Sequence, residues 1–193
     1  MSRRQVGLFF GSFNPVHVGH MILANFMATR TSLDEVWFVV SPHNPFKKRG
    51  SLARDHDRFH LVELAIGDTP RLRASRVEFD LPKPSYTIDT LAVLREKYPT
   101  YDFSLIMGSD NLASLPKWKN HELILRDFAI QLYPRPGFPG GELLEHPRVT
   151  LYDAPLMHLS ATYVRDAIRT GESIRYLVPP AVEEELLKSG LYR

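Results

Sequence analysis

The stretch QVGLFFGSFNPVHVGHMILANFMATR, residues 5–30, places a short apolar run directly before a loop that holds glycine, proline and two histidines. The run QVGLFF (5–10) is continuous and short, which is typical of a buried strand. Apolar residues then recur at helical spacing over about 16–30 and predict a helix. We therefore expect the loop at the carboxyl end of a strand, where open parallel sheets bind their ligands.

The rest of the chain repeats this alternation of strand-like and helix-like segments. Apolar runs bounded by turn residues predict strands over 35–40, 72–79, 102–107, 128–133 and 148–152. Apolar residues at helical spacing predict helices over 54–67, 85–98, 160–171 and 179–190. This order indicates an α/β fold, a single doubly wound and mainly parallel sheet with helices on both faces. One domain is expected to cover residues 1–193.

The composition narrows the classes of function. Of the 193 residues, 44% are hydrophobic and 24% are charged, and the net charge is only +2, which gives no argument for nucleic acid as a partner. No apolar stretch approaches the length of a membrane span. The chain has no cysteine, which excludes disulfides, cysteine-based zinc sites and thiol catalysis and fits a cytoplasmic location. The oligomeric state is left open.

The segment GSFNPVHVGH, residues 11–20, combines features that suit a ligand site. Gly11 lets the chain leave the strand sharply, and Pro15 suits the first turn of the next helix. His17 and His20 are three residues apart, so both are expected to project from one face of that turn. Gly19 removes a side chain between them and lets a ligand approach the backbone.

Three interpretations of the two histidines compete on the sequence alone. They could cap or pack near the start of the helix. They could bind a metal, although zinc takes three or four protein ligands and no cysteine or second histidine pair is nearby. They could also donate to a phosphate or nucleotide, because free N–H groups and the helix dipole make the start of a helix an anion site.

Four blocks that span nearly the whole chain bear on this choice. They are GSFNPVHVGH, PSYTIDTL (84–91), MGSD…LPKW (107–118) and LSATYVR (159–165), and the chain closes with GLYR. Together they resemble the bacterial nicotinate-nucleotide adenylyltransferase family of the H-x-G-H nucleotidyltransferase superfamily, which implies its Rossmann-like fold. The family usually has Gly-Gly-Thr-Phe-Asp-Pro where this chain has Phe10-Gly11-Ser12-Phe13-Asn14-Pro15.

The resemblance implies adenylylation of nicotinate mononucleotide by ATP, which releases pyrophosphate and serves NAD biosynthesis. The attacking group is a phosphate whose second pKa is about 6, so it is mostly dianionic near pH 7 and requires no general base. The step needs in-line positioning and charge neutralisation instead. The implied cofactor is Mg²⁺ held by ATP phosphates and water, so we expect no protein metal cage.

The resemblance also implies roles for residues around ATP. His17 and His20 are the expected catalytic donors to the phosphates. The other expected ATP-binding residues are Gly11, Ser12, Phe13, Lys47, Ser160, Thr162 and Arg165. Lys48 or Arg49 could replace Lys47. Without the resemblance, the simplest interpretation is that Ser160 caps a helix and Arg165 is a surface arginine of that helix.

A second set of residues is implied for the mononucleotide. Asp110, after the open position Gly108, is expected to accept ribose hydroxyls, and Trp118 to stack on the pyridine ring. Packing of Trp118 in the core is the alternative. Ser85, as a helix N-cap, begins the segment Ser85, Tyr86 and Thr87, whose N–H groups are expected to bind the nicotinate carboxylate. The cation of Lys119 could help to bind this carboxylate, or the side chain could point into water.

Rival functions remain open. The same chemistry could act on nicotinamide mononucleotide or on phosphopantetheine, although the Ser-Tyr-Thr and Pro-x-Trp blocks argue against phosphopantetheine. A non-catalytic nucleotide-binding regulator could share the fold, although it would not need the donors of the phosphate site, which are His17, His20, Ser160 and Arg165.

Overall fold

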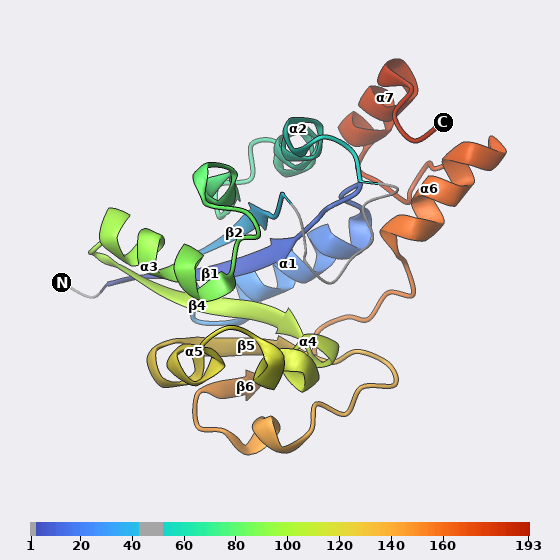
Figure 1. Cartoon of the computed structure of the whole chain (residues 1–193). Helices are drawn as coiled ribbons and strands as arrows, with labels where there is room; N and C mark the ends of the chain where they lie inside the picture. The colour runs from blue at the N-terminus through green and yellow to red at the C-terminus, as the bar shows by residue number, and fades with distance from the viewer. Residues whose placement is uncertain (1–2, 43–51) are drawn as a thin grey trace.

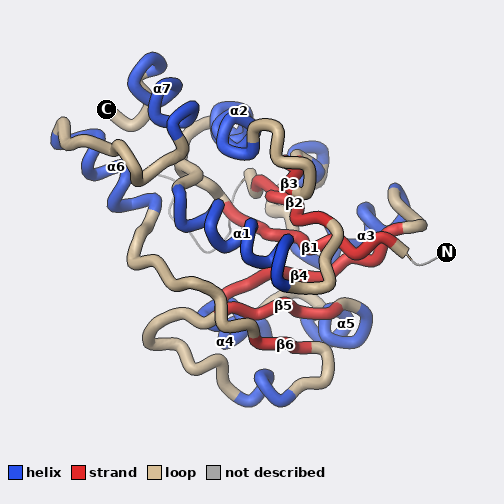
Figure 2. Tube along the Cα trace, turned by 180° about the vertical axis from the view of Figure 1, so that it is seen from behind, coloured by secondary structure: helices blue, strands red, loops and turns tan. Residues whose placement is uncertain are grey.

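The computed structural model describes residues 3–42 and 52–193, which contain a six-stranded, all-parallel sheet. The strands are β1 (Arg4–Gly11), β2 (Glu35–Val40), β3 (Leu72–Ser75), β4 (Tyr101–Gly108), β5 (Ala129–Tyr133) and β6 (Val149–Leu151). Their spatial order is β3-β2-β1-β4-β5-β6, visible from behind in Figure 2. The direction of winding therefore reverses between β1 and β4, which creates a topological switch point at their carboxyl ends.

Helices cover both faces of the sheet, as Figure 1 shows. On one face, α1 (Val18–Arg30), α2 (Asp55–Ile66), α6 (Ala161–Thr170) and α7 (Pro180–Ser189) contribute to one core cluster. On the other face, α3 (Thr87–Lys97), α4 (Ser109–Ser114) and α5 (His121–Asp127) contribute to a second. Short 3-10 helices span Val77–Asp80, Leu115–Lys117 and Glu142–Glu145. The doubly wound α/β fold expected from the sequence is confirmed.

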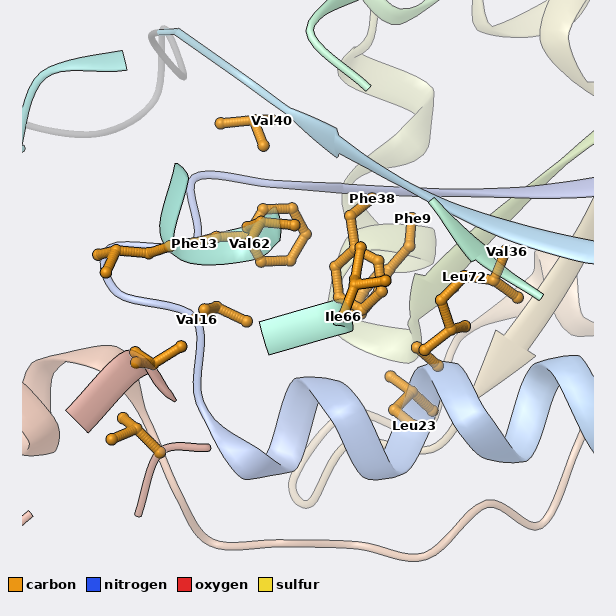
Figure 3. Packing of buried hydrophobic residues seen from close by; sticks show 14 of the residues in the cluster. Phe9, Phe13, Val16, Leu23, Val36, Phe38, Val40, Val62, Ile66 and Leu72 are labelled. Atoms are coloured by element: carbon orange, nitrogen blue, oxygen red, sulfur yellow. The ribbon is translucent and has the colours of Figure 1, made fainter. Parts of the chain in front are cut away.

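Strand β1 separates the two cores because successive side chains point to opposite faces. Val6 and Leu8 pack against α3–α5, whereas Phe9 packs on the side of α1. The Phe9 ring lies 5.6 Å from those of Phe13 and Phe38, and Figure 3 shows these rings between the sheet and α1. Phe13 belongs to the loop after β1, so this contact ties the loop to the core.

Two local expectations are wrong in detail. The segment 72–79 stays a strand only to Ser75, because β2, its partner, ends one residue beyond the last pair Val39↔Ser75. Ser85 is not the N-cap of α3: the N–H groups of Asp89 and Thr90 both donate to the carbonyl of Tyr86, which is the first acceptor of the helix.

The loop before α1 also differs from expectation. Pro15 lies ahead of the first turn, since α1 begins at Val18 with His17 as N-cap. Gly11 makes room for Phe13, since a Cβ there would lie 2.8 Å from the Phe13 ring, and it is Phe13 that adopts a positive φ, of 44°. Close packing of that ring therefore requires a glycine. Within 3–42 and 52–193, no helix is long and apolar enough to cross a membrane.

Candidate active site

Two clefts meet at the carboxyl ends of the central strands. The first has a volume of about 490 Å³ and extends from the loop after β1 to the start of α6. The second has a volume of about 150 Å³ and lies beside the start of α3. Both are lined by Phe10, Gly11, Ser12 and Asn111. The shared wall therefore lies at the switch point between β1 and β4, and two ligands could meet there.

The two histidines form one unit at the start of α1. The N–H of His17 donates to Nδ1 of His20 over 3.2 Å, and the two rings stack with centroids 3.7 Å apart. Because Nδ1 accepts this bond, Nε2 carries the ring proton when His20 is neutral. Both side chains line the first cleft. Capping and ligand binding are therefore compatible roles for this pair.

His17 is held in its neutral form. Burial is the main cause and the nearby positive charge of Arg135 adds to it; together they lower the pKa of His17 to about 4. Its Nδ1 has no hydrogen-bond partner within the described residues. Gly19 suits the close packing here, since a Cβ would make a tight contact, 3.1 Å, with the His17 ring. A neutral imidazole offers one donor without the cost of burying a cation.

The state of His17 predicts a pH dependence of stability. Between about pH 4 and its ordinary value of 6.5, the unfolded chain binds the proton and the folded chain does not. The free energy of unfolding should therefore rise with pH in this window, by up to about 1.4 kcal/mol per pH unit. Urea titrations of wild type and His17→Asn isolate the effect, because other titrating groups cancel in the difference. A difference that stays constant with pH would contradict the neutral state.

Helix α6 brings a second set of donors to the first cleft. The Ser160 hydroxyl accepts from the N–H of Tyr163 over 3.1 Å, so Ser160 is the N-cap, as expected. Arg165 donates from Nη1 to the carbonyl of Asn14 over 2.8 Å and from Nη2 to the Thr162 hydroxyl over 3.2 Å. The guanidinium therefore joins the start of α6 to the loop after β1, with its charge beside the cleft.

The second cleft gathers the residues expected around the pyridine ring. Ser85, Tyr86, Thr87, Trp118 and Lys119 all line it. Trp118 is half-buried and packs against the core, and it also lines the cleft, so stacking on the pyridine ring stays a prediction. Lys119 does not point freely into water, since Nζ lies 2.8 Å from Oδ2 of Asp89 and 4.8 Å from the centroid of the Tyr86 ring.

Known proteins similar to this chain identify its family. A cytidylyltransferase-like family model matches residues 8–167. A probable nicotinate-nucleotide adenylyltransferase of Cytophaga hutchinsonii is 54% identical over 97% of this chain and 98% of its own. This chain belongs to the nicotinate-nucleotide adenylyltransferase family. A relative of the same name from Flavobacterium psychrophilum is 47% identical over 98% of this chain and 99% of its own.

Solved structures support the fold of this adenylyltransferase family member. The Plasmodium falciparum nicotinic acid mononucleotide adenylyltransferase complexed with NaAD superposes with a TM-score of 0.80. The two share 21% identity, with 98% of this chain and 97% of the other covered. The same enzyme complexed with APC gives a TM-score of 0.78 at 20% identity, over 98% and 97% of the two chains. At this identity the likeness establishes the fold.

The structure divides the expected site residues between the clefts. Those expected at ATP line the first: Gly11, Ser12, Phe13, His17, His20, Ser160, Thr162 and Arg165. Lys47, with Lys48 and Arg49, lies outside the described residues. Asp110 was expected at the mononucleotide, but it lines the first cleft. Gly108 leaves room for it, because a Cβ at Gly108 would clash with Oδ1 of Asp110.

Sequence reasoning missed several residues of this adenylyltransferase site. Arg135 lines the first cleft, and its Nε lies 3.7 Å from Oδ1 of Asp110, an oxygen with no hydrogen-bond partner in the described ranges. Asn111 lines both clefts, and Glu78 lines the second. The loop PRPGFPGG (134–141) that carries Arg135 signalled only a turn. No pattern linked the two chain positions 110 and 135.

A buried arginine holds the loops together behind the site. Arg58 of α2 is fully buried and donates to the carbonyls of Ser12, Ser41, Pro42 and Ala53 and to the carboxylate of Asp55. It therefore connects the ends of β1 and β2 to the start of α2. In the sequence, Arg58 was only one of several polar positions in the helix predicted over 54–67, and nothing marked it as buried.

The C-terminal end reaches the same loop. The Tyr192 hydroxyl donates to Oδ1 of Asn14 over 2.7 Å, and the N–H of Ala53 donates to the same oxygen over 3.0 Å. Figure 1 places α7 and the C-terminus beside α2 and α6. Asn14 therefore links the loop after β1 both to the segment before α2 and to the closing residues GLYR, through Ala53 and Tyr192.

Proposed function

We propose that this chain catalyses the ATP-dependent adenylylation of nicotinate mononucleotide to nicotinate adenine dinucleotide and pyrophosphate, a step of NAD biosynthesis. The observation that carries the proposal is the meeting of two clefts at one switch point, with the histidine pair in the first and the α3 start and Trp118 in the second. ATP would occupy the first cleft and the mononucleotide the second. Residues 1–193 would act as one catalytic domain.

The reaction requires the protein to position the two substrates and to stabilise the charge that develops on the phosphates. A phosphate oxygen of the mononucleotide attacks the α-phosphorus of ATP; the new P–O bond forms as the bond to pyrophosphate breaks. The Nε2–H of His20 and a donor from His17 would follow the charge that develops on the phosphate oxygens. Ser160, Thr162 and Arg165 would hold the outer phosphates, since a capped helix start and a guanidinium both favour anions.

A magnesium ion would enter with ATP. Among the described residues that line the first cleft, Asp110 is the one carboxylate, and no group of three or more potential ligands lies together in those ranges. This donor set fits a metal held by substrate phosphates and water rather than by the protein. Bound there, the ion would neutralise phosphate charge. The orphaned oxygen of Asp110 suits a ribose hydroxyl as donor. The cytoplasmic location stays a prediction from the cysteine-free composition.

Pyrophosphate release tests the proposal directly. The purified chain is supplied with ATP and Mg²⁺ together with nicotinate mononucleotide, nicotinamide mononucleotide or phosphopantetheine in turn. We expect release with the nicotinate substrate at the highest kcat/KM. Each substrate alone is the control for background hydrolysis. Preference for the amide or for phosphopantetheine would change the substrate, and no release with any of them would favour the nucleotide-binding regulator.

Trp118→Ala should weaken the binding of nicotinate mononucleotide and leave the binding of ATP unchanged. An aromatic stack is worth about 0.5–1.5 kcal/mol, so KM for nicotinate mononucleotide should rise roughly three- to tenfold. Trp118→Phe is the matched variant, because it keeps an aromatic face in the second cleft. Initial rates against each substrate separate the two effects. Loss of thermal stability with unchanged KM would make Trp118 a core residue only.

Lys119→Ala should change the preference for acid over amide only slightly. Its charge is already paired with Asp89, and both side chains are about half exposed, so the lysine contributes less than about 1 kcal/mol. The acid-to-amide ratio of kcat/KM should fall less than about fivefold, and further at low salt than at high salt. Asp89→Asn is the matched variant: it removes the competing carboxylate and should raise the ratio. A large loss in Lys119→Ala would make the lysine a main ligand.

A further inference from the structure

The two clefts share a wall, and it is formed from two separate parts of the chain. Phe10, Gly11, Ser12 and Asn111 line both clefts. The first three follow one another at the end of β1 and in the loop after it, whereas Asn111 belongs to α4, which follows β4 (Figure 1). In the proposed function, a phosphate oxygen from the second cleft must reach the α-phosphorus of ATP in the first. The reacting atoms would therefore lie against this wall.

Asn111 brings an unused side-chain amide to the shared wall. The residue is exposed, and its main-chain carbonyl accepts a hydrogen bond from the Ser114 hydroxyl over 2.9 Å. Within residues 3–42 and 52–193, its side-chain amide has no hydrogen-bond partner. The amide offers two N–H donors on one nitrogen, whereas the Ser12 hydroxyl offers one and the side chains of Phe10 and Gly11 offer none. Asn111 therefore has the most side-chain hydrogens to give to a ligand at this wall.

The backbone that carries this amide is fixed on both sides. Ser109 is only 3% exposed, and its hydroxyl accepts from the N–H of Arg135 over 2.8 Å. Leu112 is fully buried in the core cluster on the side of α3–α5. Helix α4 is thus anchored by the neighbours of Asn111, while the Asn111 side chain itself makes no hydrogen bond in the described ranges. A substitution there should change a ligand contact without moving the helix.

The donors already assigned indicate which ligand group is left for Asn111. The ATP phosphates would be held by the histidine pair and by the start of α6, and the pyridine ring and its carboxylate by Trp118 and the start of α3. None of these assignments gives a donor to the phosphate of the mononucleotide. That phosphate must nevertheless lie at the shared wall. A neutral amide suits it, since a hydrogen bond to an ionised acceptor is about twice as strong as one between neutral groups.

We propose that the side-chain amide of Asn111 donates to the phosphate of nicotinate mononucleotide and holds its attacking oxygen in line with the α-phosphorus of ATP. Asn111 is then a catalytic residue that touches the nucleophile. It keeps its N–H protons throughout: the new P–O bond forms and the bond to pyrophosphate breaks as described above. This inference rests on the proposed function for its substrate and adds a donor for the attacking group.

Binding of nicotinate mononucleotide without ATP tests the contact separately from turnover. Asn111→Asp replaces the donor by a carboxylate of the same shape, and Asn111→Leu removes the polar group. We expect Kd from isothermal titration to rise about tenfold or more in Asn111→Asp and about three- to tenfold in Asn111→Leu, with Kd for ATP in Asn111→Leu within about twofold of wild type. An unchanged Kd for the mononucleotide in Asn111→Asp overturns the proposal. If wild type did not bind nicotinate mononucleotide, the proposed function would fall, and this inference with it.

Stability separates the contact from a structural role. Position 111 lies in the first turn of α4, where an acidic side chain is favourable, so Tm of Asn111→Asp should equal or exceed that of wild type. Its kcat/KM for nicotinate mononucleotide should nevertheless fall about tenfold or more. Ser114→Ala is the matched control: it removes the hydrogen bond to the Asn111 carbonyl from outside both clefts and should leave kcat/KM unchanged. Losses of Tm and kcat/KM that run in parallel in both Asn111 variants, or wild-type kcat/KM in Asn111→Asp, would overturn the proposal.

Discussion

Replacement of His20 by alanine is expected to lower kcat by about a hundredfold or more while KM for ATP changes little. The loss of one donor that follows developing charge costs about 3 kcal/mol in enzymes that stabilise an oxyanion. His20 suits this role because its Nδ1 is occupied by the N–H of His17, which leaves the proton on Nε2. Stopped-time assays of pyrophosphate at saturating ATP and nicotinate mononucleotide measure the effect.

Two further variants separate donation from capping. His20→Asn places an amide oxygen near the position of Nδ1, so it should keep the cap of α1 and recover the stability that alanine loses, about 1 kcal/mol. It lacks the Nε2–H, so kcat should stay low. His60→Ala, at an exposed histidine of α2 outside both clefts, is the control and should leave kcat unchanged. Near-wild-type turnover in His20→Ala would return the histidine to a structural role.

Arg58→Met should destabilise the protein by about 3–5 kcal/mol. The side chain is fully buried, and its removal leaves four carbonyls and the Asp55 carboxylate without their main donor. For a chain of this size, 3 kcal/mol lowers Tm by roughly 10 °C. Because two of the carbonyls belong to Ser12 and Ser41 beside the clefts, kcat/KM should fall as well.

Urea titration and thermal melting measure the loss of stability in Arg58→Met, and two further variants serve as comparisons. Arg58→Lys keeps the charge but cannot reach all five acceptors, so its loss should lie between wild type and methionine. Arg30→Met, at the exposed end of α1, should change the free energy of unfolding by less than about 1 kcal/mol. If Arg30→Met and Arg58→Met lost similar amounts of stability, the buried hydrogen bonds of Arg58 would not be what stabilises the fold.

The long elements could be predicted because their patterns are strong and local. The strand over 35–40 matches β2 residue for residue, and the helices expected over 160–171 and 179–190 agree with α6 and α7 within one residue at each end. Periodicity and capping residues carry this information along the chain. The short β3 was overextended, since its end depends on a partner strand that local sequence does not reveal.

The motifs also determined the family, and most of the site residues that they predicted line the two clefts. They did so because loops that follow parallel strands must meet at one edge of the sheet. The tertiary structure alone decided how these residues are paired: His17 stacked on His20, Asp110 in the first cleft, and Lys119 held by Asp89. It alone revealed Arg58 and Glu78. The place of each arises from burial and from contacts between distant segments, and neither is encoded in the local order of residues.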